Sequence, residues 1–144
     1  MTQNEKDILL RDLCARLPYK VKVQIKNVSK ICTLEEIDCN SDEMSVAVKH
    51  ENGELNGYDF DLAKPYLFPM SSMTEEQYYE MMSCSSEDCL DHMEMLKSLR
   101  ECTDFTHWPL YEYRVIDWFN KNHFDYRGLI PMGLANDATD KNIY

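Results

Sequence analysis

The chain has 144 residues, enough for one compact domain that buries its own hydrophobic core without a disulfide scaffold. Acidic residues outnumber basic ones by 26 to 15, giving a net charge of −11, and such a field repels nucleic acid phosphates. The composition therefore argues against a general DNA- or RNA-binding protein, although a local basic pocket can still hold a small anion.

No apolar run approaches the roughly 20 residues that span a bilayer. Residues 1–7 mix acids with one lysine, where a signal peptide needs a basic start and an apolar block. We therefore expect a cytoplasmic protein that does not contact membranes. Its six cysteines are scattered among apolar positions, which favours reduced, mostly buried thiols.

The N-terminal half is predicted to be one helix followed by short strands. Residues 4–16 carry apolar side chains at helical spacing, and the helix should end before Pro18. From Tyr19 the period changes to an alternation of apolar residues with Lys20, Lys22 and Lys26, typical of a strand with one basic, wet face. Further strands are expected over 31–37 and 44–48, and through Tyr58, Phe60 and Leu62 after two Asn-Gly turns.

The C-terminal half is predicted to be helical. Residues 64–69 contain two prolines and are expected to be an ordered crossing segment, neither central strand nor helix. Helices are expected after Ser72 or Thr74, again from about Ser85, and after Trp108-Pro109 to about Asn122. The polar tail to Tyr144 is expected to be frayed, so that deleting residues 137–144 leaves folding intact.

These patterns predict an α+β fold. Residues 1–70 should form a helix and a small antiparallel β-sheet or SH3-like barrel. Residues 71–144 should form a helical region that packs with the first part as one compact unit.

The sequence carries no complete catalytic constellation. Nucleophile-elbow, zincin and phosphate-loop motifs are lacking, and the chain has only four glycines. The best metal-ligand set is Cys84, Cys89 and His92, with Cys102 or His107 as a fourth ligand, but its spacing matches no zinc motif. We therefore expect no cofactor and no bound metal.

Two groups of residues are candidates for binding. One is the lysine series Lys20, Lys22, Lys26 and Lys30, which is either a solvated strand face or a contact surface for an acidic ligand. The other is the aromatic C-terminal segment, whose residues are mostly core but also resemble a stacking pocket or a protein-binding hot spot. Its candidate site residues are Trp108, Tyr111, His123, Tyr126 and Arg127.

Three strings resemble an uncharacterised family of short proteins from gut Bacteroidales and their phages. They are Leu17-Pro18-Tyr19-x-Val21-Lys22-Val23, Lys64-Pro65-Tyr66-Leu67-x-Pro69-Met70-Ser71-Ser72-Met73-Thr74-Glu75-Glu76, and Asp117-Trp118-Phe119-Asn120-x-x-His123-Phe124-Asp125-Tyr126-Arg127-Gly128-Leu129-Ile130-Pro131. The chain departs from the family at Lys20, where we expect glycine in relatives. The resemblance implies no activity and carries over no catalytic residue.

The resemblance implies a phage-like setting, in which small acidic proteins often blunt host defences. The first functional hypothesis is accordingly a non-catalytic protein that binds and inhibits a host protein such as a defence component. The second is a small-ligand binder that sequesters a nucleotide-type signal or similar anion, for instance across the interface of a homo-oligomer. The third is a small enzyme of unknown reaction.

Overall fold

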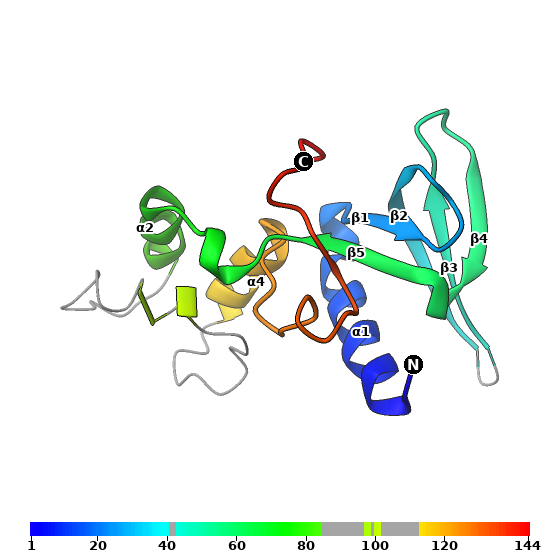
Figure 1. Cartoon of the computed structure of the whole chain (residues 1–144), viewed down its shortest axis with the longest axis horizontal. Helices are drawn as coiled ribbons and strands as arrows, with labels where there is room; N and C mark the ends of the chain where they lie inside the picture. Colours follow the sequence, from blue (N-terminus) through cyan, green and yellow to red (C-terminus); the bar gives the residue numbers. More distant parts are fainter. Residues whose placement is uncertain (41–42, 85–96, 99, 102–112) are drawn as a thin grey trace.

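The computed structural model describes residues 1–40, 43–84, 97–98, 100–101 and 113–144 (Figure 1). Within these ranges the fold is α+β, with a six-stranded sheet in the order β4-β3-β2-β1-β5-β6. β4 and β6 are the two edges of this sheet and do not pair with each other. The sheet is therefore open, and the predicted alternative of an SH3-like barrel is wrong.

The first five strands pair antiparallel, and β6 joins β5 in parallel. Their bounds are β1 Lys22–Ile25, β2 Ile31–Cys39, β3 Met44–Lys49, β4 Leu55–Asp59, β5 Ala63–Leu67 and β6 Asn136–Asp137. The first three confirm the predicted strands. The fourth strand ends earlier than predicted, because Phe60–Leu62 form a turn of 3₁₀ helix that carries the chain around to β5.

The proline-containing segment 64–69 was predicted to be an ordered crossing segment that is neither central strand nor helix, and this is wrong because its first part belongs to β5. β5 lies between β1 and β6, with Pro65 opposite Val23. The Lys26 N–H donates to the Leu62 carbonyl, so alternation along the ladder makes Val23 and Pro65 a non-hydrogen-bonded pair. The missing N–H of Pro65 thus faces away from β1, and β6 pairs only from Tyr66 onward.

Helix α1 spans Gln3–Arg16 and begins with a capping box, in which Thr2 and Glu5 satisfy each other's backbone N–H. It ends as predicted, since Pro18 lies in the 3₁₀ turn Leu17–Tyr19 that follows. Lys20 leaves this turn in the left-handed conformation (φ 55°), which glycine adopts more readily than other residues. Lys20 therefore lies outside the strand that follows.

Two further helices belong to the described C-terminal part. Helix α2, Glu75–Ser83, begins at the predicted cap Thr74, and helix α4 covers Tyr113–Lys121. Most of the helix predicted from Ser85, and the start predicted at Trp108-Pro109, lie outside the described residues. Among the helices that the structure describes, none is both long and apolar enough to cross a membrane.

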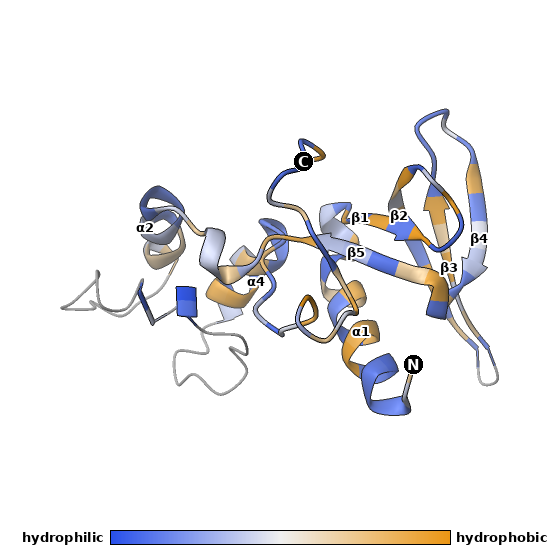
Figure 2. Ribbon diagram, in the orientation of Figure 1, coloured by the Kyte–Doolittle hydropathy of each residue, from blue (hydrophilic) through white to orange (hydrophobic). Residues whose placement is uncertain are grey.

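The core consists of two hydrophobic clusters. The first joins α1 to the inner face of the sheet and includes Leu9, Leu13, Val23, Leu34 and Val46. Figure 2 shows this apolar material on α1 and on the strands beside it. The second cluster joins α2 and α4 to the chain around residue 124 and is rich in aromatic side chains, which are Tyr78, Trp118, Phe119, Phe124 and Tyr126.

The C-terminal tail is packed, which contradicts the predicted fraying. Ala138 is fully buried and its N–H donates to the Leu67 carbonyl. The Tyr144 hydroxyl donates to the Tyr66 carbonyl at 2.6 Å and accepts the Lys22 N–H at 3.1 Å. In Figure 1 the tail crosses β5 on its way to residue 144. Its polar sequence shows no apolar period because its two anchors are a small residue and one phenol.

Candidate functional site

Arg127, a predicted site residue, lies in a buried charge network. Its Nη1 donates to the Asp12 Oδ1 at 2.9 Å, and its guanidinium lies 4.3 Å from the centroid of the Tyr126 ring. Asp12 is fully buried and also accepts two hydrogen bonds from the equally buried Arg16. Arg127 thus binds the chain segment after α4 to α1.

Arg16 completes this network, and its buried guanidinium is compensated by several hydrogen-bond acceptors. Besides Asp12, its guanidinium donates to the backbone carbonyls of Phe119 and Phe124. These acceptors lie in and just after the last turn of α4, where carbonyls have no partner inside the helix. Because the buried Arg16 donates to all of these acceptors, it connects α1 to α4 and serves a structural role.

His123 and Tyr126, two more predicted site residues, are also buried. The Tyr126 hydroxyl donates to the Asn120 Oδ1. His123 has φ 58° and stacks on Tyr144, with ring centroids 4.0 Å apart. Burial, helped by the charge of Arg16, lowers the His123 pKa from 6.5 to about 4, so the ring is neutral at neutral pH. Trp108 and Tyr111 lie outside the described residues.

The lysine series does not form one surface. Lys20 is paired with Glu35 at 2.6 Å. Lys26 follows β1 and lines a separate cavity with Asn27 and Lys64. Lys22 and Lys30, by contrast, line one cavity together, and this cavity is the candidate site that contains residues of the lysine series from both β1 and the β1–β2 connection.

Cross-strand register builds the floor of this cavity. Lys22 on β1 lies opposite Thr33 on β2, and Thr33 lies opposite Lys49 on β3. Side chains of directly opposite residues lie on the same face of a sheet, so the two lysines flank the threonine hydroxyl. The Lys22 Nζ donates to the Thr33 Oγ1 at 2.8 Å. This row lies on the face opposite the buried Cys32 and Leu34, which point towards α1.

The walls add further polar groups. Ser29 and Lys30 come from the β1–β2 connection, His50 and Glu51 follow β3, and the packed tail contributes Asn142 and Ile143. The cavity measures about 590 Å³, a volume typical of small-molecule sites. None of the ion pairs between described residues involves Lys22, Lys30 or Lys49. Three lysines therefore line one cavity without an ion pair to any described carboxylate, and Glu51 is the acidic residue in the same lining.

A cysteine, a histidine and a tyrosine form a chain beside this cavity. The Cys32 Sγ lies 3.3 Å from His50 Nδ1, and the Tyr58 hydroxyl lies 3.3 Å from His50 Nε2. Cys32 is 1% exposed and does not line the cavity. Desolvation raises the pKa of its thiol, which opposes formation of the thiolate that a nucleophile needs. The arrangement joins β2, β3 and β4 and does not make an accessible nucleophile.

The metal-ligand set considered from the sequence cannot be assembled here, because Cys89, His92, Cys102 and His107 lie outside the described residues. Cys84 is described, and its thiol contacts the Glu80 carbonyl. Among the residues that the structure describes, no three His, Cys, Asp or Glu side chains are grouped as metal ligands are.

The sequence identified Lys22 and Lys30 but not their partners in the cavity. Lys49 and Thr33 stand at ordinary strand positions, and His50 was one of four histidines without a distinguishing context. Only the register of β1, β2 and β3 brings them together. Alternation within Met44–Lys49 could have indicated that Lys49 faces away from the core, but not which residues it faces.

Comparison of the chain with protein-family models, with curated proteins and with solved structures finds no match. The site therefore has to be interpreted from its own chemistry.

Proposed function

We propose that this protein is a non-catalytic binding protein that takes a small anionic ligand, of the phosphate-bearing class, in the cavity over Lys22, Thr33 and Lys49. The observation that carries the proposal is the meeting of Lys22, Lys30 and Lys49 without a paired carboxylate, in a chain with 26 acidic residues. An acidic protein has ample means to neutralise exposed lysines. Three unpaired ammonium groups around one cavity favour an external anion as the partner.

Electrostatics and hydrogen bonding both fit this ligand class. Lys22 and Lys49 flank Thr33 from the two neighbouring strands, so their like charges lie on the same face of the sheet and repel each other. An anion over Thr33 would relieve that repulsion and accept charge-assisted hydrogen bonds from the ammonium groups. Ser29 and Asn142 supply further donors around the rim.

The lining also limits what the ligand presents. Of the residues around the cavity, His50 is the one with a ring, and both of its nitrogens are already engaged by Cys32 and Tyr58. Recognition should therefore rest on charge and not on stacking of a base. A nucleotide-type signal would be held through its phosphates, with Glu51 disfavouring a ligand that fills the whole cavity with negative charge.

The other two functional hypotheses have different support. An enzyme would need a reactive group in the cavity, and the described thiol that contacts the lining residue His50, that of Cys32, is buried with a raised pKa. Binding to a host protein, with the phage-like setting that the resemblance implies, remains a hypothesis. Its physical support is the open edge strand β4, at the opposite end of the sheet from β6.

Calorimetric titration with inorganic phosphate, pyrophosphate and ATP, at low and moderate salt, tests the proposal. We expect saturable binding that weakens with salt, and a double variant Lys22→Met/Lys49→Met that weakens it by about tenfold or more. Methionine keeps the apolar stem of each side chain, so the fold should be retained. The matched control is Lys26→Met/Lys121→Met, which removes the same charge elsewhere on the surface.

Two results would reject the proposal. One is the absence of saturable binding of all three anions at millimolar concentration. The other is equal loss of binding in the control double variant, because the cavity would then contribute only to the general field of the protein.

A further inference from the structure

Strand β4 leaves one long edge of the sheet open. The His50 N–H donates to the Glu54 carbonyl, and β4 then pairs with β3 in regular antiparallel register. Hydrogen-bonded and non-hydrogen-bonded pairs alternate in such a ladder. Leu55, Gly57 and Asp59 are therefore the residues whose backbone N–H and C=O groups point away from β3.

Most of these groups are left uncovered by the described part of the chain. β4 is the terminal strand of the sheet, and no hydrogen bond between described residues outside the β3–β4 ladder uses the backbone of Leu55 or Gly57 or the N–H of Asp59, whose carbonyl begins the 3₁₀ turn Phe60–Leu62. In Figure 1 β4 lies at the far end of the sheet from α2 and α4. The strand therefore presents a row of backbone donors and acceptors to its surroundings.

The side chains of β4 also leave this edge accessible. Leu55 is 58% exposed, and a Cβ placed on Gly57 would meet no atom within 4 Å. Natural sheets usually protect an edge with lysine, proline or a bulge, and Leu55–Asp59 contains neither residue and pairs without a register shift. Tyr58 is turned to the other face, where its hydroxyl contacts His50.

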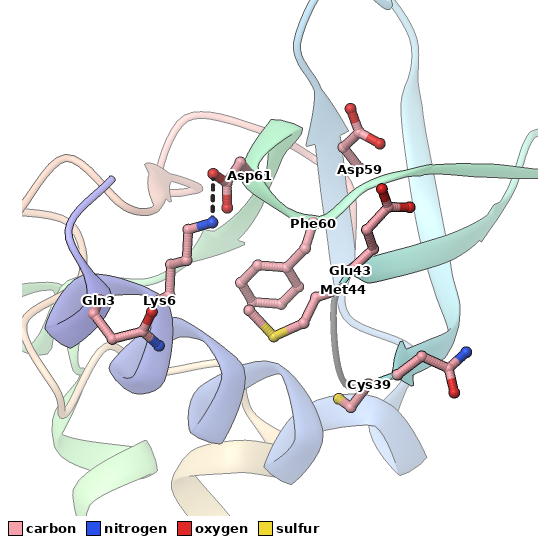
Figure 3. Close-up of a pocket in the computed structure, with 9 residues that line it drawn as sticks. Gln3, Lys6, Cys39, Glu43, Met44, Asp59, Phe60 and Asp61 are labelled. Atoms are coloured by element: carbon pink, nitrogen blue, oxygen red, sulfur yellow. Dashed lines mark ion pairs between the residues drawn. The ribbon is translucent and has the colours of Figure 1, made fainter.

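The end of this edge is acidic. A cavity of about 640 Å³ begins where β4 ends, and Glu43, Asp59 and Asp61 line it together with Phe60 and Met44. Figure 3 shows the Phe60 ring between α1 and the strands, with Lys6 pointing to Asp61. Lys6 and Asp61 form an ion pair at 2.9 Å, while no ion pair between described residues involves Glu43 or Asp59.

We propose that β4 is a docking edge for an extended, basic segment of another protein, which adds to the sheet as a seventh strand. Backbone hydrogen bonds to Leu55, Gly57 and Asp59 would supply the affinity, as in other cases of strand addition. A basic residue opposite Asp59 and a bulky residue over Gly57 would supply the selectivity. The net charge of −11 steers a basic segment towards this protein.

The same charge argues against a second copy of this chain as the occupant. Two copies would bring together two proteins of net charge −11, with Asp59 and Glu43 of each near the shared edge. The basic cavity over Thr33 lies on a sheet face and not on this edge, so the two proposals involve different residues.

A synthetic peptide of alternating lysine, tyrosine and valine separated by threonines is the probe. Its binding is measured by fluorescence anisotropy, and amide hydrogen exchange is followed in the same samples. We expect saturable binding that slows exchange at Leu55, Gly57 and Asp59 and leaves Asn56 and Tyr58 unchanged. A peptide with N-methyl groups on its pairing edge should bind about tenfold more weakly or not at all.

Two variants test the edge on the protein side. Gly57→Pro removes an outward donor but no β3–β4 hydrogen bond, and should weaken peptide binding by about tenfold while phosphate binding is retained. Asp59→Lys should weaken binding by a similar factor at low salt, whereas the matched change Asp140→Lys in the tail should alter it less than threefold.

The proposal is overturned if the peptide fails to bind at millimolar concentration or binds without protecting these three amides. It is also overturned if the free protein already protects them and elutes as a dimer in light scattering, because the occupant would then be a second copy.

Discussion

The ring of Tyr144 stacks on the buried imidazole of His123, with centroids 4.0 Å apart and planes inclined by 17°. The contact joins the C-terminal tail to the turn that follows α4. The Tyr144 residue is 43% exposed, yet its hydroxyl is enclosed between the Lys22 N–H and the Tyr66 carbonyl, and desolvation raises its pKa. Together with the buried Ala138, Tyr144 thus holds the tail in place, and the tail residues just before it, Asn142 and Ile143, line the basic cavity.

Tyr144→Phe should destabilise the protein by about 1–3 kcal/mol, because it leaves a donor and an acceptor without their partner while keeping the ring in place. Urea unfolding followed by circular dichroism measures the free energy. The control is Tyr113→Phe at a position that is 75% exposed, where the change should be within about 0.5 kcal/mol. If both variants unfold at the same urea concentration as the parent, the hydroxyl contacts are not formed in solution.

His123 should make stability fall as the pH is lowered. Its folded-state pKa of about 4 lies below the value of 6.5 expected for the unfolded chain, so the unfolded state binds a proton more readily. The contribution is complete above pH 6.5 and is lost as the pH falls towards 4. At about 1.4 kcal/mol for each pKa unit, the full loss is roughly 3 kcal/mol.

His123→Asn isolates this contribution, because asparagine tolerates the left-handed backbone at this position and does not titrate. The neighbouring Asp125 has a pKa raised by burial and acts in the opposite direction, so the difference between parent and variant is the quantity to compare. Unfolding free energies at several values between pH 4 and 7 give both curves. Parallel curves would show that His123 is accessible to protons in the folded protein.

The four described cysteines should differ in reactivity. Cys14, Cys32, Cys39 and Cys84 are all free, as predicted, but Cys14 and Cys39 are exposed where buried thiols were expected. Peptide mapping after brief iodoacetamide treatment should find Cys14 and Cys39 labelled and Cys32 unlabelled until the protein is unfolded. Rapid native labelling of Cys32 would mean that the chain through His50 and Tyr58 opens readily.

Local patterns predicted the elements whose stability is mainly local. The alternation around β1 and β3, the stop at Pro18 and the cap at Thr74 all have direct signatures in the sequence. β5 was missed because Pro65 argues against a strand unless its missing donor faces an unpaired edge, and that depends on the neighbours. β6 has two residues and no periodicity at all.

The candidate site was only partly predictable, because it depends on strand register. Lys22 and Lys30 were identified as basic residues, but Lys49 joins them through two pairings across β2. The tail adds Asn142 by the packing of Tyr144 and not by any pattern of its own. Such relationships arise between segments far apart in the chain, where composition and spacing carry no information about contact.

Arg127 shows how the same residues can fit two interpretations. An arginine beside aromatic side chains occurs both in ligand sites and in buried networks. The sequence could not distinguish them, because the distinguishing partner is Asp12, 115 positions away. The side chain of Arg127 is 19% exposed and that of Asp12 is fully buried, so loss of this contact should lower the free energy of unfolding.

Arg127→Met should therefore destabilise the protein by about 1–3 kcal/mol, since it removes a charge-assisted hydrogen bond to a buried carboxylate that keeps Arg16 as its other partner. Trp118→Ala should cost more, about 3–5 kcal/mol, because this buried ring stacks on Phe124 in the second cluster. Arg11→Met, at an exposed position on α1, is the matched control for loss of a guanidinium and should change stability by less than about 0.5 kcal/mol. Urea unfolding gives these free energies, and phosphate titration of the same proteins should give affinities within twofold of the parent.

An Arg127→Met protein with parental stability but weakened phosphate binding would instead assign Arg127 to the ligand, and would move the anion site from the sheet to the end of α4.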